Sequence, residues 1–338
     1  MKRFCLLFNA PKQVSIQEEQ LNAPGTGQVL VRTEVSAISP GTEMLIYRGD
    51  FSGHLAIDET IDSLAGRLAY PMRYGYSAVG RVIALGPGVD PAWEGRLVFS
   101  FQPHASHFIA TTEALMPAPQ GLSPEQACFL PNMETAVNFL MDGAPLLGER
   151  VVVFGQGIVG LLTTSLLGRF PLACLITLDR HALRRQASRL AGASTSLDPA
   201  AQDVDRQLND LLADGADLTY ELSGAPAALD QAIRLTGFSG RVVIGSWYGS
   251  KRAELDLGGR FHRSRIRLIS SQVSSLAPEL SGRWDKRRRF SLAWEMIAEI
   301  DPARWITHHF PFDRAAEAYQ LLDHSPQEAI QVLLTYPS

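Results

Sequence analysis

Hydrophobic and polar residues follow two different patterns along this chain, and the change falls near residue 120. Before it, short β-rich runs at 29–35 and 78–85 are separated by turn residues, among them Ser39-Pro40-Gly41 and Gly86-Pro87-Gly88. The start of the chain, 1–10, has an apolar run that we interpret as a first strand. Short strands bounded by glycine and proline are typical of antiparallel sheets. This region predicts a barrel-like antiparallel domain.

Beyond residue 120 the pattern becomes one of strands alternating with helices. Ser123, with Pro124 next and Gln126 three residues after it, is a helix N-terminal signal. Buried-strand runs follow at 151–154, 175–178, 218–222 and 241–245. This alternation predicts a parallel sheet. Near the end, a helical pattern at 315–322 and an apolar strand at 329–335 predict a return to the first domain. We expect two domains, 1–120 with a C-terminal return at 305–338, and 121–304.

A glycine-rich turn follows the first strand of the second domain. The strand at 151–154 leads into Gly155-Gln156-Gly157-Ile158-Val159-Gly160, which opens an apolar helix. Gly155 permits a tight turn, Gly157 lets a diphosphate approach the backbone, and Gly160 lets helix and strand pack closely. The helix N-terminus adds N–H donors and a positive dipole end. We assign all six residues to a dinucleotide site in a Rossmann fold, a doubly wound parallel sheet.

An acidic residue at the end of the next strand strengthens this assignment. Asp179 lies 24 residues after Gly155, close to the spacing expected for a carboxylate on the adenosine ribose. Such a carboxylate repels a 2′-phosphate and favours NAD. The guanidinium groups of Arg180, Arg184 and Arg185 suit the 2′-phosphate of NADP, so NADP remains an alternative cofactor. The other interpretation is that these arginines form a solvated helix face. We include Arg180 in the cofactor site.

Other cofactor contacts are expected at the carboxyl ends of later strands, where open α/β sheets bind ligands. Ser223 follows the strand 218–222, and Ser246, Trp247 and Tyr248 follow 241–245. Trp247 and Tyr248 would flank a nicotinamide, the alternative being that they pack in the core. Thr135, in the first helix of the domain, is assigned to the same site.

Several segments together resemble one protein superfamily over nearly the whole chain. They are Val29-Leu30-Val31-Arg32, Gly41-Thr42-Glu43, Gly75-Tyr76-Ser77-Ala78-Val79-Gly80, the glycine turn, and Ile306-Thr307-His308-His309-Phe310. The chain resembles the medium-chain dehydrogenase/reductase superfamily. The resemblance implies an α/β fold, with a GroES-like β-barrel catalytic domain and a Rossmann domain, and NAD(P)-dependent oxidoreductase activity.

The chain departs from the zinc enzymes of that superfamily at their metal ligands. Pro40, or Ser39 if one residue is inserted, stands where they have cysteine, and Tyr76 stands where they have histidine. The four-cysteine structural lobe is missing too. A catalytic zinc needs three protein donors, so we predict a zinc-free enzyme without metal ligands. Ile38–Glu43, Trp247-Tyr248-Gly249 and Gly259–Arg263 are similar to the subgroup that contains bacteriochlorophyllide hydroxyethyl dehydrogenases.

Without zinc, hydrogen-bond donors must stabilise the negative charge that develops on the substrate oxygen. Thr42 matches the superfamily position whose hydroxyl touches that oxygen, although it is also a candidate for capping the next turn. Tyr76 offers a phenol, or an aromatic ring for packing. His104 is the candidate proton carrier because imidazole is the side chain suited to that role, the alternative being a surface histidine on an edge strand. Glu134 would face the nicotinamide, or simply sit in a helix's first turn. These four are the catalytic candidates.

Three functions remain open on the sequence. The leading one is the NAD(P)-dependent, zinc-independent interconversion of a secondary alcohol and a ketone on a specialised biosynthetic intermediate. The second is reduction of an activated C=C bond, as in quinone and enoyl reductases, and the third is non-catalytic dinucleotide sensing. Basic runs at 260–267 and 283–289 favour an anionic substrate, the alternative being a solvated face.

The amino-acid composition argues against nucleic acid and membranes as binding partners. Hydrophobic residues make up 46% of the chain, and its 31 Lys and Arg against 35 Asp and Glu give a net charge of −4. No global positive field draws it to nucleic acid or an anionic membrane, and no apolar run suits a membrane span. Three scattered cysteines form no disulfide framework, which favours the cytoplasm. Alternating residues in 265–274 suggest an edge strand that pairs in a homodimer. The expected partner is otherwise a small-molecule substrate.

Overall fold

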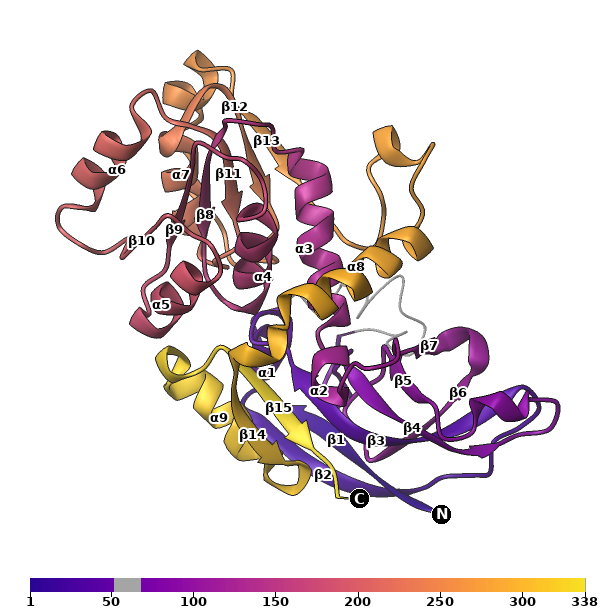
Figure 1. The fold of residues 1–338 in the computed structure, drawn as a ribbon. Helices are drawn as coiled ribbons and strands as arrows, with labels where there is room; N and C mark the ends of the chain where they lie inside the picture. Colours follow the sequence, from indigo (N-terminus) through magenta and orange to yellow (C-terminus); the bar gives the residue numbers. More distant parts are fainter. Residues whose placement is uncertain (52–67, 338) are drawn as a thin grey trace. The chain divides into compact units, whose positions relative to one another are not determined.

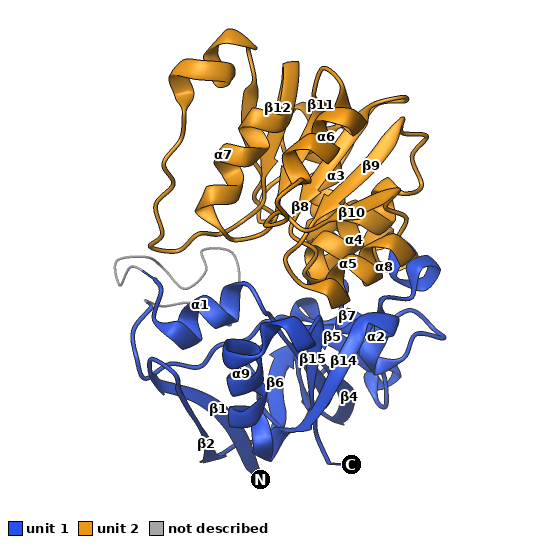
Figure 2. Ribbon diagram, turned by 90° about the vertical axis from the view of Figure 1, so that its left-hand side faces the viewer, with its two compact units in different colours: residues 1–131, 296–338 blue, residues 132–295 orange. Residues whose placement is uncertain are grey.

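The computed structural model describes residues 1–51 and 68–337, which form two compact units. Unit 1 comprises 1–131 and 296–338, and unit 2 comprises 132–295 (Figure 2). The sequence predicts domain boundaries at 120/121 and 304/305. The two units instead divide at 131/132, near the start of α3, and at 295/296, inside α8.

Unit 1 is built on a mixed sheet and a separate hairpin. The hairpin pairs β1 with β2, and the sheet runs in the order β14-β15-β3-β4-β5-β7, with β6 also paired to β3 (Figure 1). The pairing is an open path from β14 to β7 within the described residues. The elements are β1 (Lys2–Ala10), β2 (Gln13–Gln20), β3 (Gln28–Ile38), α1 (Thr42–Arg48), β4 (Ala78–Leu85), β5 (Leu97–Ser100), β6 (His107–Thr111), β7 (Met116–Pro117), α2 (Pro124–Ala127), β14 (Ile306–Pro311), α9 (Ala315–His324) and β15 (Gln331–Thr335).

The C-terminal segment completes this unit. β15 pairs antiparallel with β3, with Val332 opposite Ile38, and it pairs parallel with β14. Tyr319 and Leu322 of α9 pack with Phe8 and Met44 in one buried cluster. The last strands are therefore part of the sheet that the first strands begin, as the apolar pattern at 329–335 predicts.

Unit 2 is an α/β structure with a parallel sheet. Its strand order is β10-β9-β8-β11-β12-β13, the order 3-2-1-4-5-6 of dinucleotide-binding folds. Its elements are α3 (Leu130–Gly143), which begins just before the boundary, β8 (Arg150–Phe154), α4 (Ile158–Leu167), β9 (Cys174–Leu178), α5 (Ala182–Leu190), β10 (Thr195–Leu197), α6 (Val204–Leu212), β11 (Ala216–Glu221), α7 (Pro226–Leu235), β12 (Thr236–Ile244), β13 (Arg267–Ser270) and α8 (Lys286–Ile300).

Alternate residues of β8 bury both faces of this sheet. Val152 and Phe154 pack in a cluster with side chains of α6 and α7. Val151 and Val153 pack on the other face with Phe139 of α3 and with α4. A parallel sheet covered on both faces explains why these strands read as continuous apolar runs. The predicted α/β fold class, with its doubly wound parallel sheet, is confirmed.

Candidate cofactor and active site

The glycine turn between β8 and α4 fits a dinucleotide. Gly155 has φ +86°, and a Cβ there would lie 2.6 Å from Ser223 Cα; a Cβ on Gly160 would lie 2.0 Å from the Gly155 carbonyl oxygen. A Cβ on Gly157, by contrast, would meet no atom of residues 1–51 and 68–337 within 4 Å. Gly155 and Gly160 are therefore required by the fold, whereas Gly157 borders open space.

The first turn of α4 adds donors beside Gly157. Gly157 is the N-cap of this ten-residue helix, and no side chain of the described residues caps it. The first amides of a helix have no partner within the helix, so they and the dipole favour an anion. Gln156 contributes differently from the prediction. Its side chain is buried and bonds the Gly155 carbonyl and Thr164, which shapes the turn. The predicted residues Ile158 and Val159 supply the amides that follow Gly157.

Asp179 is held at the other end of this site. It follows β9, and its side chain is 7% exposed. Oδ2 accepts the Gln156 N–H over 2.7 Å, and Oδ1 accepts the His181 N–H over 2.8 Å. Each carboxylate oxygen has two lone pairs. The carboxylate is therefore fixed beside the glycine turn and keeps acceptor capacity for ribose hydroxyls.

The arginines beside Asp179 have different environments. Arg185 donates to the carbonyl oxygens of Asp179 and Arg180 and pairs with Asp198 at 3.1 Å. Arg180 is exposed. Burial lowers the pKa of Arg184, and the Asp179 carboxylate opposes that shift. The Arg185 side chain therefore bonds within its own loop.

A buried acid that the sequence analysis missed organises the ends of β11 and β12. Glu221 is fully buried. Ser223 Oγ donates to its Oε1 and Tyr248 donates to its Oε2, each over 2.5 Å. Ser246 Oγ accepts the Gly224 N–H. Burial and Glu221 raise the pKa of Tyr248. The predicted residues Ser223, Ser246 and Tyr248 therefore lie together at the carboxyl ends of β11 and β12. Trp247, between the last two in the chain, is exposed. An acid inside an otherwise apolar strand run was the available signal.

In unit 1, the predicted catalytic residues Tyr76 and Thr42 both donate hydrogen bonds to the side chain of Ser39. The Tyr76 hydroxyl donates to Ser39 Oγ over 2.6 Å, and the Thr42 N–H donates to the same oxygen over 3.3 Å. All three residues are partly exposed. Thr42 is the first residue of α1, and its backbone rather than its side chain joins this cluster. Sequence reasoning had given Ser39 no role beyond replacing a cysteine.

A buried acid–imidazole pair supports the same segment. Glu43 Oε2 lies 2.9 Å from His104 Nε2 and accepts the Tyr319 hydroxyl over 2.6 Å, while Oε1 accepts the Ser39 N–H over 2.9 Å. His104 Nδ1 lies 2.7 Å from Ser36 Oγ. Neither side chain of the pair is exposed. The interpretation of His104 as a surface histidine was wrong, because its ring is enclosed between Ser36 and Glu43.

Glu134 is placed in a buried ion pair. Its Oε1 accepts Arg289 Nη2 over 2.7 Å and Nε over 3.0 Å, and the guanidinium is fully buried. Burial raises the pKa of Glu134, and Arg289 opposes that rise. Because α3 begins at Leu130, Glu134 is not in a first turn, which corrects that alternative. These contacts favour a structural role. Thr135, the next residue, is half-buried on the same helix.

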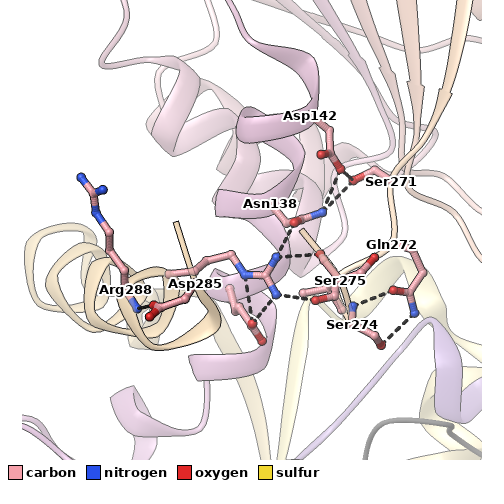
Figure 3. A network of polar contacts seen from close by, with 11 residues as sticks. Asn138, Asp142, Ser271, Gln272, Ser274, Ser275, Asp285 and Arg288 are labelled. Carbon is pink, nitrogen blue, oxygen red and sulfur yellow. Dashed lines mark hydrogen bonds and ion pairs between the residues drawn. The ribbon is translucent and has the colours of Figure 1, made fainter. Parts of the chain in front are cut away.

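The network continues from Arg289 along α3 (Figure 3). Arg289 Nη1 donates to Asn138 Oδ1 over 2.5 Å, and Asn138 donates to Asp142 and to Ser271 Oγ. Arg289 also donates to the carbonyl oxygens of Val273 and Ser275. Its place on the buried face of α8, four residues before Ala293, was the signal that sequence reasoning missed.

The basic runs do not gather at the glycine turn. Arg267 is the first residue of β13 and pairs with Arg241 of β12, which lies level with Val151 near the start of β8. Residues 260–267 therefore lie at the amino-terminal edge of the parallel sheet, opposite the edge where Gly155 follows β8. Arg260 donates to the carbonyl oxygens of Thr236 and Asp214. In the second run, Arg289 is buried and Arg288 lies over the Trp284 ring at 3.9 Å. The first run therefore lies away from the glycine turn, and the anionic substrate stays a prediction.

Among the residues described, His, Cys, Asp and Glu nowhere gather in threes in an arrangement suited to a metal ion. Within that same part of the chain, every helix is too short or too polar to traverse a lipid bilayer.

Comparisons with known proteins agree with this geometry. A zinc-binding dehydrogenase family model matches residues 159–292. The chain is 25% identical to D-guloside 3-dehydrogenase of Escherichia coli over 98% of this chain and 99% of the relative. It is 25% identical to L-threonine 3-dehydrogenase of Pyrococcus horikoshii, with 90% of each chain covered.

A solved structure shows the same fold. It is a short chain alcohol dehydrogenase (rspB) from Escherichia coli complexed with NADH, with TM-score 0.79, 20% identity and 99% of each chain covered. The family model covers only part of unit 2, but the relatives extend over nearly the whole chain. With the strand order and the glycine turn described above, they support the resemblance of the chain to the medium-chain dehydrogenase/reductase superfamily.

Proposed function

We propose that this chain is an NAD(P)-dependent oxidoreductase that interconverts a secondary alcohol and a ketone without a catalytic zinc ion. The observation that carries the proposal is the turn at Gly157, where backbone amides border open space beside the fixed Asp179 carboxylate. The named relatives include dehydrogenases of a guloside and of threonine, both of which carry secondary alcohols. An alcohol–ketone reaction is therefore the chemistry we assign.

Unit 2 supplies the cofactor site in this proposal. The amides of residues 157–160 bind the diphosphate, and Asp179 accepts hydrogen bonds from the adenosine ribose. When bound, the nicotinamide accepts or supplies the hydride. Because Asp179 is held by two backbone amides, it keeps its place at the ribose and disfavours a 2′-phosphate, which supports NAD over NADP.

Unit 1 supplies the groups that act on the substrate oxygen. Pro40 or Ser39 stands at one zinc-ligand position of related enzymes and Tyr76 at another, and none of the three binds zinc as cysteine or histidine does. Hydroxyl donors would take over the stabilisation of negative charge. We also propose, from the similar segments at 38–43, 247–249 and 259–263, that the chain is related to the subgroup that includes bacteriochlorophyllide hydroxyethyl dehydrogenases.

The test is oxidation of a defined set of secondary alcohols: methyl D-guloside, L-threonine, sorbitol and 2,3-butanediol, each with NAD⁺ or NADP⁺. Formation of reduced cofactor at 340 nm, together with less than stoichiometric zinc by mass spectrometry, supports the proposal. Stoichiometric zinc that is needed for turnover contradicts its metal-free part.

Product labelling separates the competing reductase function. With cofactor deuterated at the transferring position, label on a carbinol carbon supports carbonyl reduction, and label β to a carbonyl supports C=C reduction. Cofactor binding without any transfer would leave the sensing function.

We also propose that the chain forms a homodimer through β13, which lies at one end of the sheet order. An edge strand exposes unpaired backbone groups that a second copy can pair with. Sedimentation velocity should show a dimer at micromolar concentration, and a monomer there contradicts this pairing.

A further inference from the structure

Ser39 occupies an unusual position among the polar groups of unit 1. We propose that its hydroxyl donates the hydrogen bond and then the proton to the substrate's reacting oxygen, and that the buried Glu43–His104 pair positions it. This inference rests on the proposed alcohol–ketone chemistry and assigns residues that perform it.

The hydrogen bonds around Ser39 Oγ fix what this hydroxyl is able to do. A serine hydroxyl has two acceptor lone pairs and one donor hydrogen. The Tyr76 hydroxyl and the Thr42 N–H fill both lone pairs. The one remaining capacity of Ser39 is to donate. A donor whose own oxygen accepts hydrogen bonds is strengthened by them, and it therefore suits an oxygen on which negative charge develops.

The buried pair holds both segments that meet at Ser39. Glu43 Oε1 accepts the Ser39 N–H, and Glu43 Oε2 faces His104 Nε2. The His104 ring lies against Gly75, which has φ +120° and whose added Cβ would come 2.7 Å from His104 Cδ2. Tyr76 is the next residue. A closed circuit therefore runs from Ser39 through Glu43, His104 and Gly75 to Tyr76 and back to Ser39.

The proton balance of the reduction follows from this circuit. The carbonyl carbon receives a hydride from the reduced nicotinamide, and the carbonyl oxygen takes the Ser39 proton. Ser39 takes the Tyr76 proton, and the partly exposed Tyr76 recovers one from solvent. Alcohol oxidation runs through the same transfers in reverse.

Matched variants test Ser39 directly. Ser39→Ala should lower kcat on the alcohol panel by about 100-fold or more, the usual effect of removing one such donor. Ser39→Thr keeps a hydroxyl and should restore most of the rate. Ser106→Ala is the control, because Ser106 Oγ is also half-buried in unit 1 and also accepts a backbone N–H, from Phe4, but lies outside the circuit. It should leave kcat unchanged.

A binding readout is independent of turnover. 2,2,2-Trifluoroethanol resists oxidation, and ¹⁹F NMR reports its binding to the protein with NAD⁺. Loss of one hydrogen bond should weaken that binding about tenfold in Ser39→Ala and leave it unchanged in Ser106→Ala. Nicotinamide fluorescence should show equal NADH affinity for all of these variants.

The positioning role has its own test. Gly75→Ala removes no polar group but pushes on the His104 ring, so kcat should fall with KM unchanged. Glu43→Gln keeps an oxygen for the Ser39 N–H and should retain more activity than Glu43→Ala.

The outcomes separate this inference from the function beneath it. If NADH binds and wild type turns over, but Ser39→Ala matches wild type in kcat and trifluoroethanol affinity, the Ser39 assignment is wrong and the proposed function stands. If NADH binds and no panel alcohol reacts, the hydride-transfer proposal fails and takes this inference with it.

Discussion

Replacing Glu134 by glutamine removes the negative charge that faces a fully buried guanidinium. Arg289 directs Nε and Nη2 to one oxygen of Glu134, and its other bonds go to uncharged oxygens. Glutamine keeps an acceptor there but removes the only carboxylate, among the described residues, that bonds the guanidinium directly; Asp142 acts on it through Asn138. Breaking such a buried pair costs about 3–5 kcal/mol. For a unit of this size, that lowers the melting temperature by about 6–20 °C.

Calorimetry and urea denaturation measure this loss, with NADH binding and turnover followed on the folded variant below its transition. The matched control is Arg288→Met, since Arg288 is the adjacent residue but is exposed over Trp284; its loss should cost less than about 1 kcal/mol. We expect Glu134→Gln to be much less stable and, while folded, to bind NADH like wild type. Unchanged stability with turnover reduced more than tenfold would refute the structural role and restore Glu134 as a catalytic residue.

Three further predictions follow from individual contacts. Asp179→Asn should weaken NADH binding about 10- to 100-fold, because charge-assisted ribose hydrogen bonds are lost, and should narrow any preference over NADPH; equal weakening of both cofactors would place Asp179 away from the ribose. Burial and Arg32 lower the pKa of His107 from 6.5, so the unfolded chain binds the proton more readily and this contribution to stability is complete above pH 6.5 and falls as the pH drops toward the folded value. His107→Gln should therefore flatten the stability profile below pH 6.5, and identical profiles would contradict that sign. Prolonged dialysis against EDTA should leave turnover unchanged, whereas activity that is lost and then restored by Zn²⁺ would show a catalytic metal.

Sequence was a good guide wherever the signal was local. The Ser123 capping box forms as its spacing predicts, with both of its reciprocal hydrogen bonds to Gln126. The strand predicted at 78–85 is β4. The glycine turn has the shape its three glycines predict, because each reason for glycine depends on atoms within one strand–turn–helix unit or its neighbouring strand.

Sequence failed where partners are distant along the chain. Glu43 accepts the Tyr319 hydroxyl, which is 276 residues away, and Arg289 meets Glu134 from 155 residues away. Charge alone suggested an anionic substrate or a solvated face for Arg289, and catalysis or a first helical turn for Glu134. The ion pair between α3 and α8 appears only in the folded structure. His104 was misjudged for the same reason, since its burial depends on β3 and α1 rather than on its own segment.

The central claim is that a pyridine dinucleotide lies against the backbone at Gly157, and one titration tests it most directly. The φ of Gly157 is −64°, which any residue adopts, and a Cβ there meets no atom of the described part of the chain within 4 Å. Gly157→Val should therefore keep the wild-type melting temperature. Followed by nicotinamide fluorescence, wild type should bind NADH and Gly157→Val should not, because the branched side chain fills the diphosphate's place. Failure of wild type to bind NADH and NADPH, or equal binding by the valine variant, would contradict the account.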